Sequence, residues 1–396
     1  MEKIKYFNEG LDIKNKRIIL RADYNVPITS KLIQDKTRIN LSLPFIKKLL
    51  ERKAKVLLIS HLGRPENDKD KNLSLRPVFN YLQEKIDYKI YFYSEKITNK
   101  TQEKISFLNS GELIFFENIR LNDGELKNDD DFAKSLSNLG DIYINDAFSC
   151  SHRKQTSIHK ITKYMKNSYA GPLLMKEILS IDMVLNNKKN PTTCIIGGSK
   201  ILTKIGVINS LIKKVNNLII VGAMANNFIK FKGNKVGKSL VEEDSEKVIK
   251  EIYKNADKYN CEIITPFDFA VSESVEGNAA FKDINNVDKN EIILDIGPQT
   301  IKKISKIIDM SKTVLWNGPA GYFENKNFSK GTTSIAEKIS NNTNTASLLS
   351  IVGGGDTISA IKNNKLDLSF THLSTAGGAF LEYIEGKNLP GIEVLK

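Results

Sequence analysis

Residues 192–204, TTCIIGGSKILTK, pass from a short apolar run into a glycine pair and then into a segment with helical spacing. The run 192–197 has the length and the β-branched content of a buried strand. Similar apolar runs alternate with helix-period segments along the whole chain. This alternation predicts an α/β fold with parallel sheets flanked by helices on both faces. The 396 residues suffice for two domains of this kind, or three.

The expected strands share short apolar runs bounded by polar or glycine-rich turns: 17–22, 55–60, 112–117, 141–145, 192–197, 217–222, 261–265, 291–296, 313–316 and 347–352. The expected helices lie between them: 37–52, 129–138, 200–214, 243–259, 298–310 and 356–363. The division between domains falls near 171–191. There Gly171-Pro172 opens a helix-like stretch with proline in its first turn, which predicts a stiff connector hinged at both ends.

The composition narrows the class of protein. A net charge of +13 allows nucleic acid, acidic membranes or small anions as partners, but the lysines are spread along the chain, so a solvated lysine-rich surface is the default expectation. Three widely spaced cysteines argue against a disulfide framework and suit a reducing compartment. No apolar run of 18 residues occurs and the N-terminus lacks a signal-like apolar stretch, so we expect a soluble, cytoplasmic protein.

All eight arginines lie between Arg17 and Arg153, whereas the 51 lysines (59 Lys+Arg minus 8) are spread over the chain. A guanidinium binds carboxylate or phosphate as a planar fork, whereas lysine acts as a point charge. An anion site in the first half explains this segregation, and chance drift of a rare residue explains it equally well on composition alone.

Polar residues follow the expected strands of the first half, where ligands bind in open α/β sheets. They are Asp23 and Asn25, His61 and Arg64, Asn118 and Arg120, and finally Asp146, His152 and Arg153. A single arginine is more often a surface ion-pair partner. For Arg38, Arg64, Arg120 and Arg153 taken with His61 we favour an anion site, although Arg38 is not directly strand-terminal. Arg17, Arg52 and Arg76 lie outside these clusters and are interpreted as structural.

The second half has glycine turns at the corresponding places. Gly197-Gly198-Ser199-Lys200 follows a strand, and Lys204 one helical turn later is expected on the same helix face as Lys200. Residues 353–357, GGGDT, follow another strand and open a helix, where Asp356 would cap the helix or bind Mg²⁺. A tight turn before a capped helix explains either motif alone, but the two together with two lysines favour nucleotide phosphate.

Other chemistries find no support. Residues 233–239, GNKVGKS, have one residue too few between the glycines for a P-loop, and G-x-G-x-x-G and G-x-S-x-G are both absent. The four histidines and three cysteines show no metal-ligand spacing.

Nine motifs, in order along nearly the whole chain, closely resemble the 3-phosphoglycerate kinase family: RADYNVP (21–27), SHLGRP (60–65), ENIRLNDGE (117–125), NDAFSCSHR (145–153), GPLLMKE (171–177), GGSKILTKI (197–205), LDIGPQT (294–300), WNGPAGYFE (316–324) and GGGDT (353–357). The resemblance implies two Rossmann-like domains across a cleft. These are a phosphoglycerate-binding domain (1–172 with the tail from about 376–396) and a nucleotide-binding domain (191–375), joined by a linking helix and hinge (173–190).

The resemblance also implies the activity and the site. The implied reaction, part of glycolysis and gluconeogenesis, is reversible transfer of the acyl phosphate of 1,3-bisphosphoglycerate to Mg-ADP, giving 3-phosphoglycerate and ATP. The residues similar to the family's acid-substrate site are Asp23, Asn25, Arg38, His61, Leu62, Gly63, Arg64, Arg120 and Arg153. Those similar to its nucleotide site are Gly198, Lys204, Asn317, Pro319, Glu324, Gly354, Gly355, Asp356 and Thr357, with Asp356 toward Mg²⁺. Arg38 and Lys200 resemble the catalytic pair that neutralises the migrating phosphoryl group.

The residue chemistry agrees with this reading. A carboxylate acceptor is already ionised at neutral pH, so the reaction needs alignment and charge neutralisation but no general base. Closure about the linking helix would bring the two substrates together. The resemblance favours a monomer, with neither nucleic acid nor membrane as partner.

Two alternatives remain open: a nucleic-acid-binding relative of the fold and an inactive scaffold. The first lacks a clustered basic face with aromatics, and the second is opposed by intact Arg38, Lys200, Lys204 and Asp356. Departures from the family pattern at Cys150, Tyr322 and Ala376 leave local packing and nucleotide affinity open.

Overall fold

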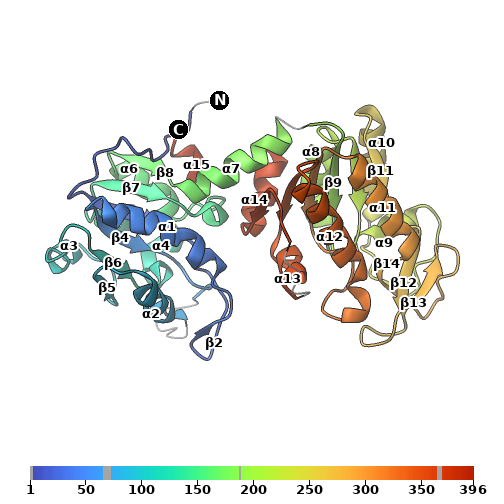
Figure 1. The fold of residues 1–396 in the computed structure, drawn as a ribbon, viewed down its shortest axis with the longest axis horizontal. Helices are drawn as coiled ribbons and strands as arrows, with labels where there is room; N and C mark the ends of the chain where they lie inside the picture. Colours follow the sequence, from blue (N-terminus) through green and yellow to red (C-terminus); the bar gives the residue numbers. More distant parts are fainter. Residues whose placement is uncertain (1–2, 66–72, 187–188, 364–367) are drawn as a thin grey trace. The chain divides into compact units, whose positions relative to one another are not determined.

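The computed structural model describes residues 3–65, 73–186, 189–363 and 368–396. The chain divides into two compact units (Figure 1). The first comprises residues 1–178 together with 388–396, and the second comprises residues 179–387. Among the described helices, none is long and apolar enough to cross a membrane.

A six-stranded parallel sheet forms the centre of the first unit, in the order β5-β6-β4-β1-β7-β8. Its strands are β1 (Arg17–Arg21), β4 (Lys55–Ile59), β5 (Ile90–Tyr93), β6 (Leu113–Phe116), β7 (Ile142–Asn145) and β8 (Ser168–Ala170). The hairpin strands are β2 (Ile28–Thr29) and β3 (Leu32–Ile33). The helices are α1 (Thr37–Glu51), α2 (Arg76–Lys85), α3 (Thr101–Lys104), α4 (Asp123–Lys127), α5 (Asp130–Ser137), α6 (Ile161–Tyr164) and α15 (Pro390–Glu393). Short helical turns are η2 (Ile119–Leu121), η3 (Phe148–Cys150) and η4 (Thr156–Lys160).

Both faces of this sheet are buried, as alternating strand residues show. Ile18 and Leu20 of β1 belong to one apolar cluster with residues of α1 and α2. Ile19, between them, belongs to a second cluster with residues of α5 and α6. Successive side chains of a strand point to opposite faces, so the sheet is covered by helices on both sides.

A second six-stranded parallel sheet forms the centre of the second unit, in the order β11-β10-β9-β15-β16-β17. Its strands are β9 (Thr192–Ile196), β10 (Asn217–Ile220), β11 (Glu262–Ile264), β15 (Thr313–Asn317), β16 (Leu349–Gly353) and β17 (His372–Ser374). A separate antiparallel sheet pairs β13 (Ala280–Asp283), β12 (Asp268–Ser272) and β14 (Ile292–Ile296) in that order.

The helices of this unit are α8 (Ile205–Ile212), α9 (Ala225–Phe231), α10 (Ser245–Lys258), α11 (Pro298–Met310), α12 (Lys330–Asn344), α13 (Gly355–Asn363) and α14 (Gly377–Glu385), with short turns η5 (Leu202–Lys204) and η6 (Lys326–Phe328). Ile195 and Trp316 share an apolar cluster with residues of α11, α12 and α13. Their strand neighbours Ile196 and Leu315 are buried as well, so this sheet too is covered on both faces.

The expected α/β class with two parallel sheets flanked by helices is confirmed. One expectation is wrong in detail: the apolar run 291–296 forms β14, which belongs to the antiparallel sheet instead of a parallel one. Its alternate residues Ile292 and Leu294 pack with Ala270 and Phe328 in a small cluster, which a short apolar run alone does not distinguish from a parallel strand.

The expected linking helix is α7 (Pro172–Leu185), and the division between the units falls inside it, after Ile178. At its start, the buried Asp146 carboxylate accepts hydrogen bonds from the backbone N–H groups of Leu173 (2.7 Å) and Leu174 (3.1 Å). The tail differs from the expectation. Only residues 388–396 join the first unit, because α14 packs against α8 within the second.

Candidate active site

In the first unit, the predicted acid-site residues follow the carboxyl ends of adjacent parallel strands. In the register of the sheet, Arg21 at the end of β1 pairs with Ile59 of β4 on one side and with Asn145 of β7 on the other. The segments that follow these three strands therefore begin side by side. They carry Asp23, His61 and Cys150 respectively.

Asp23 is the centre of a charged hydrogen-bond set that orders the loop after β1. Its Oδ2 accepts from Arg38 Nη1 at 2.7 Å and from Ser149 Oγ, and its Oδ1 accepts from the Asn25 N–H at 2.9 Å. Burial alone would raise the pKa of Asp23, but Arg38 and these hydrogen bonds outweigh it and hold the pKa at about 2. The Asp23 carboxylate therefore fixes Arg38 of α1 at this edge, where the sequence could only suggest it.

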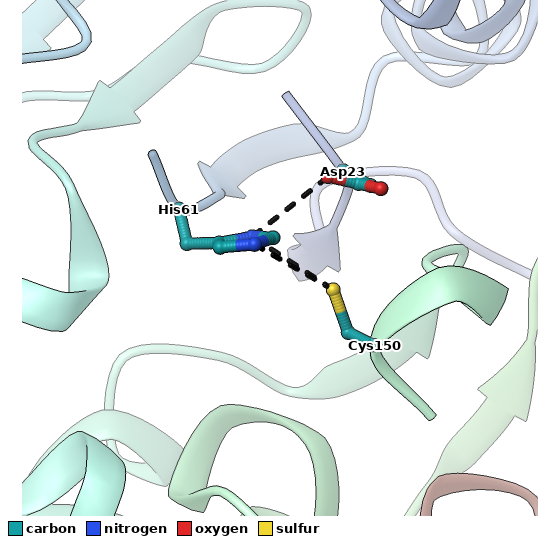
Figure 2. Close-up of side chains that lie close together, drawn as sticks. All are labelled: Asp23, His61 and Cys150. Carbon is teal, nitrogen blue, oxygen red and sulfur yellow. Dashed lines mark hydrogen bonds and ion pairs between the residues drawn. The ribbon is translucent and has the colours of Figure 1, made fainter. Parts of the chain in front are cut away.

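His61 is buried beside Asp23 and Cys150 (Figure 2). Its Nδ1 lies 3.8 Å from Cys150 Sγ and 3.8 Å from Asp23 Oδ1. The sequence did not reveal this Cys/His/Asp cluster, because its members come from three separate segments. Arg21 Nη2 lies 3.2 Å from the same Nδ1 and 3.9 Å from the Cys150 sulfur. With a guanidinium already there, the cluster is poorly suited to a cation.

The loop after β4 is held in a defined conformation. Asn118 anchors Leu62 through both its backbone groups, donating to the Leu62 carbonyl (2.7 Å) and accepting from its N–H (3.2 Å). Asn25 Oδ1 accepts from the Gly63 N–H at 2.9 Å. Gly63 has φ +58°, and a Cβ there would lie 2.6 Å from a Leu73 methyl carbon, so this position favours glycine.

The other predicted arginines differ in how they are held. Arg120 donates to the Gly63 carbonyl, while its buried Nε has no hydrogen-bond partner within the described residues. Burial, together with the charges of Arg21 and Arg153, lowers the pKa of Arg120 to about 10. Arg153 Nε lies 3.1 Å from His152 Nε2, and Arg64 is exposed. Arginines therefore gather at this edge, and a buried donor without a partner among the described residues is consistent with an anion site.

Arg17, Arg52 and Arg76 make structural contacts, as expected. Arg17 pairs with Asp141 (2.7 Å) at the opposite, amino end of β1. Arg76 stacks over the Phe92 ring at 3.9 Å from its centroid.

In the second unit, the predicted nucleotide residues follow β9, β15 and β16, which are neighbours in the sheet. Lys204 Nζ donates to the Gly197 carbonyl and, at 3.2 Å, to Asn317 Oδ1. Asn317 Nδ2 in turn donates to the Gly353 carbonyl at 2.9 Å. Burial lowers the pKa of Lys204. The side chains of Lys204 and Asn317 therefore tie together the ends of all three strands.

The turn after β16 leads into helix α13, as predicted. Gly354 has φ +105°, and a Cβ there would lie 2.8 Å from Asn317 Nδ2. Thr357 Oγ1 accepts from the Gly318 N–H at 2.7 Å. Beyond its chain neighbours and its own helix backbone, no atom of the described residues lies within 4 Å of a Cβ placed at Gly355. Asp356 is exposed in the first turn of the helix and does not cap it, since α13 already begins at Gly355.

The expectation that Lys200 and Lys204 share a helix face is wrong. Helix α8 begins only at Ile205, after the short turn η5, and Lys200 lies in irregular chain before it. The Glu242 carboxylate accepts from the backbone N–H groups of Ile201 and Leu202, which supports this non-helical start. As a result Lys200 is exposed while Lys204 is half-buried.

A cavity of about 460 Å³ lies beside the glycine turn that follows β9. Of the predicted residues, Gly198, Pro319, Glu324 and Asp356 line it. Much of its wall was missed from sequence: Gly222, Asn226, Leu240, Phe269 and residues 292–296. Gly222 lies two residues past the end of β10. The expectation that ligands bind at the carboxyl ends of parallel strands could therefore have identified it from the sequence. The residues of β12 and β14 could not be identified in this way. The sequence pattern does not reveal β12, and it predicts a parallel strand where β14 belongs to the antiparallel sheet. A volume of this size is typical of a small-molecule site.

Each α/β unit thus carries a candidate site: arginines gather after the strands of the first, and a cavity lies beside the glycine turn after β9 in the second. Comparison with known proteins is specific. The family model described as phosphoglycerate kinase matches residues 9–387. The phosphoglycerate kinase of Wolbachia sp. subsp. Drosophila simulans is 42% identical over 390 residues, covering 98% of each chain. That of Buchnera aphidicola subsp. Schizaphis graminum is 44% identical over 389 residues, covering 98% of this chain and 97% of the relative.

Solved structures agree. Phosphoglycerate kinase from Coxiella burnetii matches with a TM-score of 0.88 at 38% identity, covering 98% of this chain and 97% of that one. The Pyrococcus horikoshii OT3 enzyme matches with a TM-score of 0.83 at 27% identity and covers 98% of both chains. The chain belongs to the phosphoglycerate kinase family. It is a kinase that transfers a phosphoryl group to or from a carboxyl group.

Proposed function

We propose that the two units divide the substrates between them. The first binds 3-phosphoglycerate or 1,3-bisphosphoglycerate, and the second binds ATP or ADP with Mg²⁺. The observation that carries this proposal is the contrast between the two strand-end sites: arginine side chains gathered in one, with Arg120 buried, and glycine turns beside a cavity of about 460 Å³ in the other.

The acid substrate suits the first site because its carboxylate and phosphate are oriented anions. Arg38 is aimed by its 2.7 Å contact with Asp23, and the buried Nε donor of Arg120 finds no partner in the described part of the chain. His61, Arg64 and Arg153 complete the proposed set, with Asn25, Leu62 and Gly63 shaping the loop around it. Forked donors recognise such oxygens better than lysine does, which accounts for arginine in a chain that otherwise uses lysine.

The nucleotide suits the second site. The apolar wall of the cavity would take the adenosine, with Glu324 toward the ribose and Gly198 and Pro319 lining the rest. Lys204, Gly354, Gly355 and Thr357 would hold the phosphates at the start of α13. Asp356 fits Mg²⁺ because it offers one exposed carboxylate in the cavity, and this ion is bound by few carboxylates together with substrate phosphates. The bound ion would neutralise phosphate charge.

The proposed mechanism needs no general base, because the acceptor carboxylate is ionised at neutral pH. Arg38 and Lys200 would neutralise the migrating phosphoryl group, and alignment would supply most of the remaining acceleration. Lys200 is suited to a role during transfer because its ammonium is exposed and its backbone is not held in a helix. We expect the two units to approach about α7 when both substrates are bound.

We also propose that the protein acts as a cytoplasmic monomer. Cys150, Cys194 and Cys261 are buried thiols, which suits a reducing compartment.

A coupled assay of the purified full-length protein tests the function. ATP and 3-phosphoglycerate with Mg²⁺ should give turnover, detected by reduction of the acyl phosphate product, and chelation of Mg²⁺ should abolish it. Absence of turnover with Mg²⁺ present, under conditions where a related phosphoglycerate kinase is active, would contradict the proposal.

A further inference from the structure

A chain of fully buried polar side chains runs behind the acid site, and no step proposed so far uses it. Glu125, Ser157 and Arg21 each have 0% exposed surface. Glu125 Oε1 accepts from Ser157 Oγ at 2.6 Å, and Glu125 Oε2 accepts from the Ser157 N–H at 2.8 Å. Ser157 Oγ accepts in turn from Arg21 Nε at 3.0 Å. The end of the chain is the 3.2 Å contact of Arg21 Nη2 with His61 Nδ1.

The direction of each hydrogen bond in this chain follows from donor chemistry. A guanidinium has only donors to offer, so at the contact with Arg21 the His61 Nδ1 must be the acceptor. Nδ1 then carries no proton, and the neutral imidazole carries its proton on Nε2. Arg21 cannot turn away easily, because Nε is bound to Ser157 and Nη1 donates to the Ala22 carbonyl.

We propose that Glu125, Ser157 and Arg21 are positioning residues that hold His61 as a neutral imidazole with its proton on Nε2, ready to donate to an oxygen of the acid substrate. This inference rests on the proposed acid site. It gives His61 a role different from that of the arginines around it: a directional hydrogen bond instead of another positive charge. A carboxylate partner on Nδ1 would impose the opposite tautomer and stabilise the cation.

The groups around His61 favour the neutral form. Burial and then the charge of Arg21 on β1 lower its pKa well below the ordinary value, and Arg120 and Arg38 act in the same direction. Asp23 opposes them, but its Oδ1 lies 3.8 Å from Nδ1, beyond hydrogen-bond distance, and the carboxylate is already bound to Arg38. Cys150 also faces the ring, and burial raises the pKa of its thiol, which leaves it uncharged.

The tautomer is measured directly by two-bond ¹H–¹⁵N NMR spectra of the imidazole nitrogens. The chain has four histidines, so the His61 signals are assigned by difference from His61→Gln. We expect Nδ1 of the wild type to have the shift of an unprotonated nitrogen, Nε2 that of a protonated one, and neither to titrate between about pH 5.5 and 8. A proton on Nδ1, or titration in that range, would overturn the inference.

A matched pair of variants tests whether the hydrogen bonds that link Glu125, Ser157 and Arg21 position His61. Ser157→Ala removes the link that holds Arg21, and we expect tautomer exchange at His61 and a rise of about 3- to 10-fold in the KM for 3-phosphoglycerate, with the KM for ATP unchanged. Ser137→Ala deletes another buried hydroxyl of the same unit, which donates to the Lys134 carbonyl, and should change neither. If Ser157→Ala behaves like Ser137→Ala in both measurements, the hydrogen bonds that link Glu125, Ser157 and Arg21 do not position His61.

The same experiments separate this inference from the proposed function. Loss of the proposed function would appear as absence of turnover in the wild type, whereas the NMR assignment of the tautomer needs no turnover. Should Ser157→Ala fold poorly, the wild-type spectra alone still decide the state of His61.

Discussion

In both units the candidate site lies at the carboxyl ends of adjacent parallel strands, but the groups that form the two sites differ. In both, adjacent parallel strands end together, and the segments after them carry the polar groups. The first unit supplies side chains: Arg38 fixed by Asp23, and Arg120, whose buried Nε donor has no partner among the residues that the structure describes. The second supplies backbone: Gly198 and Gly354 have φ of +130° and +105°.

The contrast teaches how one sheet architecture serves two kinds of anion. Guanidinium forks fit a small acid whose oxygens have fixed directions. Glycine turns at a helix start let backbone N–H groups approach a polyphosphate, and the half-buried Lys204 adds charge.

The largest effect is expected from Arg38→Ala. Because Arg38 is proposed to neutralise the migrating phosphoryl group, kcat should fall by about a hundred- to ten-thousand-fold, while the Kd for ADP changes by less than about twofold. Steady-state kinetics and ADP titration measure the two quantities. Arg17→Ala, which removes an ion pair at the other end of β1, is the control and should keep kcat near that of the wild type. Equal losses in kcat and ADP affinity would contradict the division.

Lys204→Ala should act on the other substrate. Removing the half-buried ammonium beside the glycine turns is expected to raise the Kd for ADP by about 10- to 100-fold and to leave 3-phosphoglycerate binding unchanged. Calorimetric titration of each ligand measures both. Lys338→Ala, which breaks an ion pair with Asp309 on the surface, serves as the control. Unchanged ADP affinity in Lys204→Ala would remove this residue from the site.

Two adjacent glycines test whether the second site depends on its backbone. Gly354→Ala places a Cβ at φ +105° and 2.8 Å from Asn317 Nδ2, so we expect a loss of about 1–3 kcal/mol in the free energy of unfolding. Gly355→Ala meets open space in the first helical turn and should be neutral or stabilising by up to about 1 kcal/mol. Urea unfolding followed by fluorescence of Trp316, the single tryptophan, reports on this unit. Equal effects would show that the turn tolerates side chains.

A smaller effect is expected from pH. Burial lowers the pKa of Lys204, and an anionic nucleotide favours its charged form. Binding therefore takes up a proton at alkaline pH, so ADP affinity should decline as pH rises, starting below the range in which an ordinary lysine titrates. Lys204→Arg should flatten this decline. The measurement is the Kd for ADP between about pH 7 and 10, and a wild-type curve that is flat over this range would contradict the expectation.

Much of this comparison was predictable from the sequence, since apolar runs located the parallel strands and the strand-end rule located Asp23, His61 and Arg120. Other features depended on contacts between distant segments. Glu242 keeps Lys200 out of helix α8 by accepting from backbone N–H groups about 40 residues earlier. The apolar wall of the cavity comes from the antiparallel sheet, whose strand β14 looks like a parallel strand in the sequence. The burial of Arg21 against His61 has no local signal at all.

The most direct test of the division is a crossed set of four dissociation constants. Arg120→Lys keeps the charge but loses the fork in the first site, and Lys204→Ala removes the charge in the second. Calorimetry with 3-phosphoglycerate and with ADP on both variants should show the first variant impaired about tenfold or more only for the acid, and the second only for the nucleotide. If Arg120→Lys binds the acid as well as the wild type does, or if either variant loses both ligands equally, the proposed division between fork and glycine turn is wrong.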